Sequence, residues 1–254
     1  MPERQRFGYA RFPRYTGVME AIADRWARIK DELHKAARQS GRTPDAVRLV
    51  AVSKNHPITA IQAAVDLGQC RFGENRVQEA LQKIDVLANP RLEWHFLGPL
   101  QRNKARFLPG RFQWFHALED LALADTLSRH AKAAEQSLQV LIEINITGDL
   151  RKHGLAPAHL SAFLEAYYQK PRPGLHLRGL MTIGPQGGSD AACTRAFAAL
   201  RHLAERARHD FDLKDFHELS MGMSDDYALA IAEGATIVRI GSALFGERGA
   251  APTR

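Results

Sequence analysis

Short apolar runs alternate with longer amphipathic segments along most of the chain. The runs are rich in Val, Ile, Leu and Phe and bounded by polar residues, glycine or proline, which is typical of strands. Between them, apolar residues return at helical spacing, and several segments end at a glycine in the stop position. The pattern predicts strands at residues 48–53, 70–73, 92–97, 112–117, 138–146, 175–183, 216–220 and 236–241. It predicts helices at residues 18–40, 58–67, 75–87, 121–134, 191–208, 225–233 and 243–245, with two more opening near residue 100 and after Pro157.

Regular alternation of strand and helix indicates a parallel sheet, because each parallel crossover needs a helix to return the chain. Eight such units in about 200 residues is the number that closes a barrel. The alternative is an open doubly wound sheet, but neither G-x-G-x-x-G nor G-x-x-x-x-G-K-[ST] follows any predicted strand. We therefore predict an α/β protein with a single (β/α)8 TIM barrel over residues 18–250 and an extra N-terminal helix. Residues 1–17 are predicted to be a basic, poorly ordered extension.

Composition narrows the class of protein. The chain has 254 residues, 45% of them hydrophobic, and a net charge of +7. Four arginines lie in the first 17 residues, but they form no recognised nucleic-acid motif, so we predict no nucleic-acid partner. Cys70 and Cys193 are far apart and in no metal-ligand spacing, which favours free thiols in a reducing compartment and no metal site. No run suits a membrane span or a signal peptide, so we expect a cytoplasmic protein without a membrane partner.

The first predicted strand ends on a lysine, Lys54, in the run Leu49-Val50-Ala51-Val52-Ser53-Lys54. Ammonium groups rarely enter a core unpaired, so one interpretation is that Lys54 simply begins a solvated loop. The other is an amine in a low-dielectric pocket, where its pKa falls and it becomes a nucleophile toward an aldehyde.

Polar residues also collect at the ends of the other predicted strands. In a barrel these carboxyl ends meet at one rim, where the chemistry of the fold is found. Each residue alone is weak evidence, and His116 in particular is compatible with a purely structural histidine. The residues at or next to these ends are Lys54, Asn75, His95, His116, Asn145, Met181, Ser220, Arg239, Gly241 and Ser242.

The last two units carry the more specific pattern. Small and hydroxyl residues follow the seventh strand at Ser220-Met221-Gly222-Met223-Ser224, and Gly241-Ser242 repeats the theme after the eighth. Backbone amides made approachable by glycine form an anion site, and barrels commonly bind phosphate after strands seven and eight. Two ordinary N-caps, at Ser224 and Ser242, are the alternative.

A lysine on the first strand and an anion site beside the eighth are neighbours once a barrel closes. The simplest ligand using both is a phosphorylated aldehyde, either pyridoxal 5′-phosphate or a phosphorylated sugar in a Schiff-base aldolase. Arg239 bears on this choice, because a guanidinium facing a pyridine nitrogen would keep that nitrogen unprotonated and weaken the cofactor as an electron sink.

The sequence resembles the pyridoxal phosphate homeostasis proteins, relatives of the barrel of alanine racemase. The resemblance runs from about Val18 to Gly246. It is carried by residues 51–54 (AVSK), 72–79 (FGENRVQE), 94–104 (WHFLGPLQRNK), 140–145, 178–181 (RGLM), 219–226 and 238–246.

The resemblance implies that Lys54 forms the aldimine with pyridoxal 5′-phosphate. It places Asn75 and His95 at the cofactor ring with Met181 nearby, and Arg239 at the pyridine nitrogen. It also implies that the phosphate is bound by Ser220, Ser224, Gly241 and Ser242.

The family is regarded as holding and distributing the cofactor, so the resemblance implies a role in cofactor homeostasis, with transfer to apoenzymes and no established turnover. It also implies a monomer. An amino-acid racemase is the alternative, but racemisation needs a base on each face of the substrate carbon, and this chain ends shortly after the eighth strand. A scaffold without a ligand would have no use for Lys54.

Overall fold

The computed structural model describes residues 16–246. The predicted basic extension, residues 1–17, lies outside this range except for its last two residues. These already belong to helix α1, Thr16–Gln39, which begins two residues before its predicted start.

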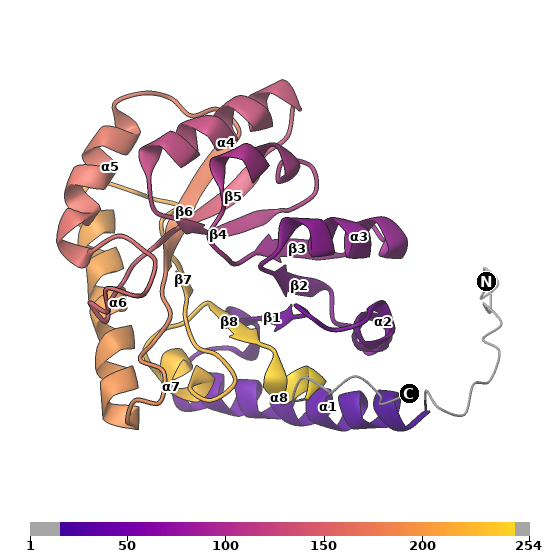
Figure 1. Ribbon diagram of the computed structural model, residues 1–254. Coiled ribbons are helices and arrows are strands. Elements are labelled where there is room, and N and C mark those ends of the chain that lie inside the picture. The colour runs from indigo at the N-terminus through magenta and orange to yellow at the C-terminus, as the bar shows by residue number, and fades with distance from the viewer. Residues whose placement is uncertain (1–15, 247–254) are drawn as a thin grey trace, which may run out of the picture.

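Eight parallel strands close into a barrel in chain order (Figure 1), as predicted. Val, Ile, Leu and Phe dominate the strands, which are buried by the barrel interior on one face and by helices on the other. The barrel closes where β1 pairs with β8, with Val50 opposite Arg239 and Ala51 opposite Ile240. The strands are β1 Arg48–Val52, β2 Arg71–Glu74, β3 Glu93–Phe96, β4 Trp114–Leu118, β5 Leu138–Glu143, β6 Leu175–Met181, β7 Glu218–Ser220 and β8 Ile237–Ile240.

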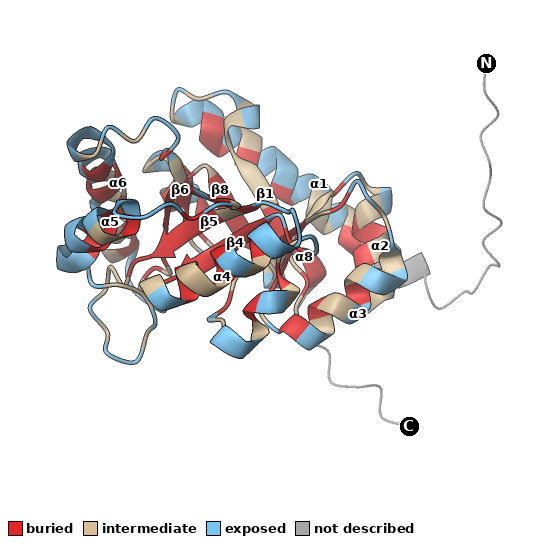
Figure 2. Ribbon diagram, turned by 90° about the horizontal axis from the view of Figure 1, so that it is seen from above, coloured by how far each residue is buried: buried red, intermediate tan, exposed pale blue. Residues whose placement is uncertain are grey.

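Helices form the outer ring, with buried residues on the faces toward the strands and exposed residues on the outer faces (Figure 2). The third crossover differs from the prediction, because it holds only a 3-10 helix. The α-helices after α1 are α2 Ile58–Asp66, α3 Val77–Leu87, α4 Leu121–Ala133, α5 Leu160–Tyr168, α6 Asp190–Asp210, α7 Tyr227–Ala232 and α8 Ser242–Phe245. The 3-10 helices are η1 Pro44–Ala46, η2 Arg102–Phe107 and η3 Pro157–His159. No helix of residues 16–246 combines the length and apolar character needed to cross a bilayer.

Helix α1 covers the seam where the first and last strands meet. It packs against α2, α7 and α8 through a face that buries Ile22, Ile29 and Leu33 (Figure 1). Just beyond it, the Arg42 guanidinium donates to the carbonyl of Ala235 at 2.7 Å, which ties the segment before β1 to the loop before β8. The extra helix therefore fastens the two ends of the barrel together.

The fifth strand is shorter than its apolar run. β5 ends at Glu143, and the chain then folds back so that Ile144 bridges Leu155 and the Asn145 amide donates to the Leu155 carbonyl at 3.0 Å. The predicted end of this strand, Ile146, therefore belongs to a loop, and Glu143 stands at the rim of the barrel.

Candidate functional site

A cavity of about 610 Å³ opens at the carboxyl ends of the strands. Seven of the nine predicted binding residues line it: Lys54, Asn75, Met181, Ser224, Arg239, Gly241 and Ser242. Its polar lining also includes His56, Glu143, Asn145, Lys152, His153, Gln186 and Asp225. Of the predicted residues, His95 and Ser220 do not contribute to this lining.

Lys54 and Arg239 reach the cavity from neighbouring strands. Lys54 lies two residues beyond β1 and is half-buried, while Arg239 lies within β8, the strand that pairs with β1. The structure thus brings to one cavity an amine and a guanidinium that are 185 positions apart in the sequence.

Arg239 is buried and held in a fixed orientation. Its Nη1 donates to Ser220 Oγ at 2.7 Å and its Nη2 donates to the Thr182 carbonyl at 2.9 Å. Burial lowers the pKa of Arg239 to about 10, against the opposing influence of Glu143 and Asp226. The guanidinium is therefore still cationic at neutral pH, and its planar donor set faces a defined direction.

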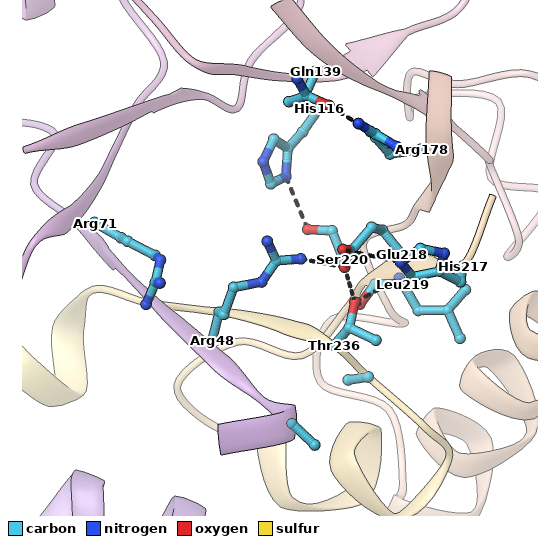
Figure 3. A network of polar contacts seen from close by, with 12 residues as sticks. Arg48, Arg71, His116, Gln139, Arg178, His217, Glu218, Leu219, Ser220 and Thr236 are labelled. Carbon is cyan, nitrogen blue, oxygen red and sulfur yellow. Dashed lines mark hydrogen bonds and ion pairs between the residues drawn. The ribbon is translucent and has the colours of Figure 1, made fainter. Parts of the chain in front are cut away.

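His95 and Ser220 lie in the barrel interior, in a chain of hydrogen bonds that ends on Arg239. His116 Nδ1 is 2.9 Å from Ser220 Oγ (Figure 3), and its Nε2 is 2.9 Å from His95 Nδ1. His95 Nε2 is in turn 2.9 Å from Glu93 Oε1. Because Ser220 Oγ accepts from Arg239, the consistent assignment is that Ser220 donates to His116, His116 to His95, and His95 to Glu93.

This assignment requires both histidines to be neutral, and burial favours that form. Burial lowers the pKa of His95, and burial, with a further contribution from the nearby cation Arg239, lowers the pKa of His116 well below its usual value. His95 and Ser220 thus support Arg239 from behind.

The loop after β7 and the start of α8 meet in the lining of the cavity. Ser224 follows β7 and Ser242 begins α8, and the Ser242 hydroxyl lies 3.0 Å from that of Ser224. The Ala243 amide of α8 also points at Ser224 Oγ, at 3.3 Å. Neither serine caps its own helix, because the N-cap positions of α7 and α8 are Asp226 and Gly241. The pair of ordinary N-caps considered from the sequence is therefore not what the structure contains.

Gly241 lies close to the end of β1. A Cβ at this position would lie 3.3 Å from the Val52 carbonyl oxygen and 3.4 Å from the Val52 Cβ, so the backbone just after β8 passes tightly against Val52. Ser224 and Ser242 thus form a wall of two hydroxyls in the lining of the cavity that Lys54 also lines, and hydroxyl donors of this kind suit an oxyanion.

Comparison with known proteins decides the family. The family model described as "Alanine racemase, N-terminal domain" matches residues 21–249. A protein of Pseudomonas aeruginosa named pyridoxal phosphate homeostasis protein is 44% identical over 230 residues, which cover 91% of this chain and 97% of its own length. One of the same name from Escherichia coli K12 is 42% identical and covers 91% and 98%.

The chain belongs to the pyridoxal phosphate homeostasis protein family. A solved structure of PipY from Synechococcus elongatus, described as having PLP bound, is 40% identical to it with a TM-score of 0.78. The match covers 89% of this chain and all of PipY.

In this member of the pyridoxal phosphate homeostasis family, Glu143 is one of the cavity residues that the sequence did not reveal as such. Glu143 is 5% exposed and lines the cavity. Burial raises its pKa to about 7, aided by the charge of Glu119 and opposed by Arg239 and His153. The one charged residue in the strand predicted at 138–146 was the available signal.

The loop after β5 supplies two further cavity residues, Lys152 and His153. The Lys152 ammonium donates to the Gly184 carbonyl at 2.9 Å, which ties this loop to the one after β6. His153 Nδ1 lies 3.5 Å from Glu119 Oε1. Such loop positions carry no periodic pattern, so sequence reasoning had no means of placing them at the cavity.

Proposed function

We propose that this protein binds pyridoxal 5′-phosphate in the cavity, holds it reversibly through Lys54, and takes part in cytoplasmic homeostasis of the cofactor by passing it to apoenzymes. The observation that carries the proposal is the cavity lining itself. An amine, a buried guanidinium and a wall of two serine hydroxyls line one space.

The residues present fit such a ligand. Its phosphate would be held by Ser224, Gly241 and Ser242, where hydroxyl and amide donors converge. Its ring would lie by Asn75 and Met181, and its nitrogen would face Arg239. PipY, whose described structure has PLP bound, shares 40% of its sequence with this chain.

Lys54 supplies the covalent part of the proposal. The lone pair of its neutral Nζ adds to the aldehyde carbon, and loss of one water leaves a C=N bond. Addition of water reverses the step and returns both the amine and the aldehyde. No oxidant or reductant is needed, so the same residue can capture the cofactor and release it.

Arg239 favours a carrier over a catalyst. A cation fixed at the nitrogen end of the ring would keep that nitrogen unprotonated, so the ring withdraws electrons less strongly when bound. We therefore propose binding and release as the function, with a monomer as the unit, and treat amino-acid racemisation as the outcome to be tested against it.

Titration with pyridoxal 5′-phosphate tests binding directly. We expect the protein to turn yellow, and Lys54→Ala to lose the imine absorbance while its circular dichroism stays that of wild type. Lys132→Ala, at an exposed lysine of α4, is the matched control and should remain yellow. A wild-type protein that stays colourless with excess cofactor would overturn the proposal.

A transfer assay separates the carrier from the racemase. The loaded protein should restore the activity of an apoenzyme faster than it releases the cofactor spontaneously into solution. Incubation with single-enantiomer amino acids should leave optical rotation unchanged relative to free cofactor. Turnover well above free cofactor would favour the racemase instead.

A further inference from the structure

A second lysine, Lys83, is buried directly behind Lys54. It projects from α3 and is 5% exposed, and it is the only lysine in the described chain with so little exposure. Lys83 does not line the cavity. Because an ammonium group is rarely placed in a core, its position calls for a physical reason.

The Lys83 ammonium has three donors, and three acceptors meet it. Its Nζ lies 2.7 Å from the Ser53 carbonyl, 2.7 Å from Glu74 Oε1 and 2.7 Å from Glu79 Oε1. The Ser53 hydroxyl donates to the same Glu74 oxygen at 2.6 Å. We call these four residues, Ser53, Glu74, Glu79 and Lys83, the Lys83 cluster.

The cluster forms hydrogen bonds to the backbone on both sides of Lys54. Before it, the Ser53 carbonyl accepts from Lys83. After it, the Asn55 amide donates to Glu79 Oε1 at 2.6 Å, and Asn55 adopts a left-handed conformation with φ of 62°. One ammonium on α3 thus fixes the turn that carries Lys54, through a direct bond on one side and through Glu79 on the other.

The cluster is poorly suited to be a source of stability. Glu74 is fully buried, its Oε2 has no hydrogen-bond partner, and burial raises its pKa despite the bonds from Lys83 and Ser53. Buried ion pairs often stabilise a fold no better than apolar residues of similar volume do. The Lys83 cluster is therefore better explained by the backbone geometry that its hydrogen bonds fix in the turn at residues 53–55.

We infer that Lys83 is a positioning residue for Lys54: the Lys83 cluster holds the turn at residues 53–55 so that the Lys54 amine meets the aldehyde in a reactive orientation. This inference rests on the proposed function. Lys83 itself is shielded from the cavity and takes no part in forming the C=N bond. Its effect is on how readily Lys54 does so.

The test compares two ligands on one variant. Glu74→Gln with Lys83→Met removes both charges of the buried pair, and the Glu79 carboxylate that remains is partly exposed and still accepts from the Asn55 amide. Pyridoxine 5′-phosphate, which has an alcohol in place of the aldehyde, reports phosphate and ring binding without the covalent step. Pyridoxal 5′-phosphate reports that step through the rate at which the imine absorbance appears.

We expect imine formation to slow by about tenfold to a hundredfold, the range that misplacing a reacting group produces. The affinity for pyridoxine 5′-phosphate should stay within about twofold of wild type. Lys132→Met is the control and should change neither quantity. Imine formation at the wild-type rate, or an equal loss of affinity for both ligands, would overturn the inference.

A milder variant keeps the inference testable if the double variant does not fold. Glu79→Gln leaves Lys83 and Glu74 paired but weakens the charged bond to the Asn55 amide, and Glu79 is partly exposed. It should slow imine formation in the same direction by a smaller factor, and an unchanged rate would contradict the inference. Absence of any imine in wild type would instead be a failure of the proposed function.

Discussion

Glu143 is a cavity residue whose pKa is raised toward neutral pH. In an unfolded chain its carboxyl titrates near 4.5, whereas burial and Glu119 raise the pKa to about 7 in the folded protein. Because this pKa is higher in the folded protein, the protonated side chain stabilises the fold, and the stabilisation is fully present below the unfolded-state pKa of 4.5. It is lost as the pH rises through about 7.

The Glu143→Gln variant should therefore gain stability relative to wild type as the pH rises. The difference in unfolding free energy between the two proteins should grow by up to about 3 kcal/mol between about pH 5 and about pH 9. Urea unfolding at a series of pH values measures it. His95 and His116 are present in both proteins, so their titration cancels, and two parallel stability curves would contradict the assignment.

Ser224 is central to the proposed phosphate site, because its hydroxyl meets both the Ser242 hydroxyl and the Ala243 amide. Removing one hydroxyl that bonds a charged group costs about 1.5 kcal/mol, so Ser224→Ala should weaken pyridoxal 5′-phosphate binding about tenfold. Isothermal titration calorimetry gives the affinity. Ser161→Ala, at an exposed serine of α5, is the control. Equal affinities in Ser224→Ala and wild type would argue against phosphate at this wall.

At the scale of elements, the turn from β7 into α7 sets the position of Ser224. Gly222 lies in this turn with φ of +92°, and a Cβ there would lie 2.7 Å from the Ala230 Cβ and 2.9 Å from the Tyr227 Cα. Both atoms belong to α7. The helix can approach the strand this closely only because residue 222 has no side chain.

Gly222→Ala should therefore destabilise the protein by about 2–4 kcal/mol, since strain and overpacking add. Gly187→Ala is the matched control, because Gly187 has φ of +66° but nothing within 4 Å of its would-be Cβ. It should cost only about 1 kcal/mol from backbone strain. Thermal unfolding of both variants makes the comparison, and equal losses would show that close packing of α7 is not the cause.

Strand and helix periodicity was enough to predict the order of elements and the closed barrel, and hence which strand ends share a rim. That is why Lys54 and Arg239 could be brought to one site from the sequence, with their roles suggested by the family resemblance. The height of each strand in the barrel could not be predicted, since it depends on the stagger between neighbouring strands. His95 and Ser220 were therefore expected at the cavity and instead lie below it. Glu143 was missed because its strand ends three residues earlier than its apolar run.

At the scale of the molecule, the barrel is a ring whose first and last strands must meet. Helix α1 fastens that seam, and Ile29, at 1% exposure, lies in its buried face. Lys54 follows β1 and Ser242 follows β8, on opposite sides of this seam, so the geometry of the cavity depends on closure.

Ile29→Ala should cost about 2–5 kcal/mol, the range for a large-to-small change in a core. Hydrogen exchange should quicken in β1 and β8 more than in β4 and β5, because the seam loses its cover. Val86→Ala, at a position 65% exposed on α3, should change stability by no more than about 0.5 kcal/mol. Uniformly faster exchange in every strand would indicate that α1 stabilises the barrel as a whole and not the seam.

Borohydride trapping is the most direct test of whether Lys54 forms a C=N bond with the aldehyde of pyridoxal 5′-phosphate. Reduction of the loaded protein, followed by peptide mass spectrometry, should find one phosphopyridoxyl group per chain, on Lys54. Its appearance on other lysines in equal measure, or its absence from Lys54, would contradict the account.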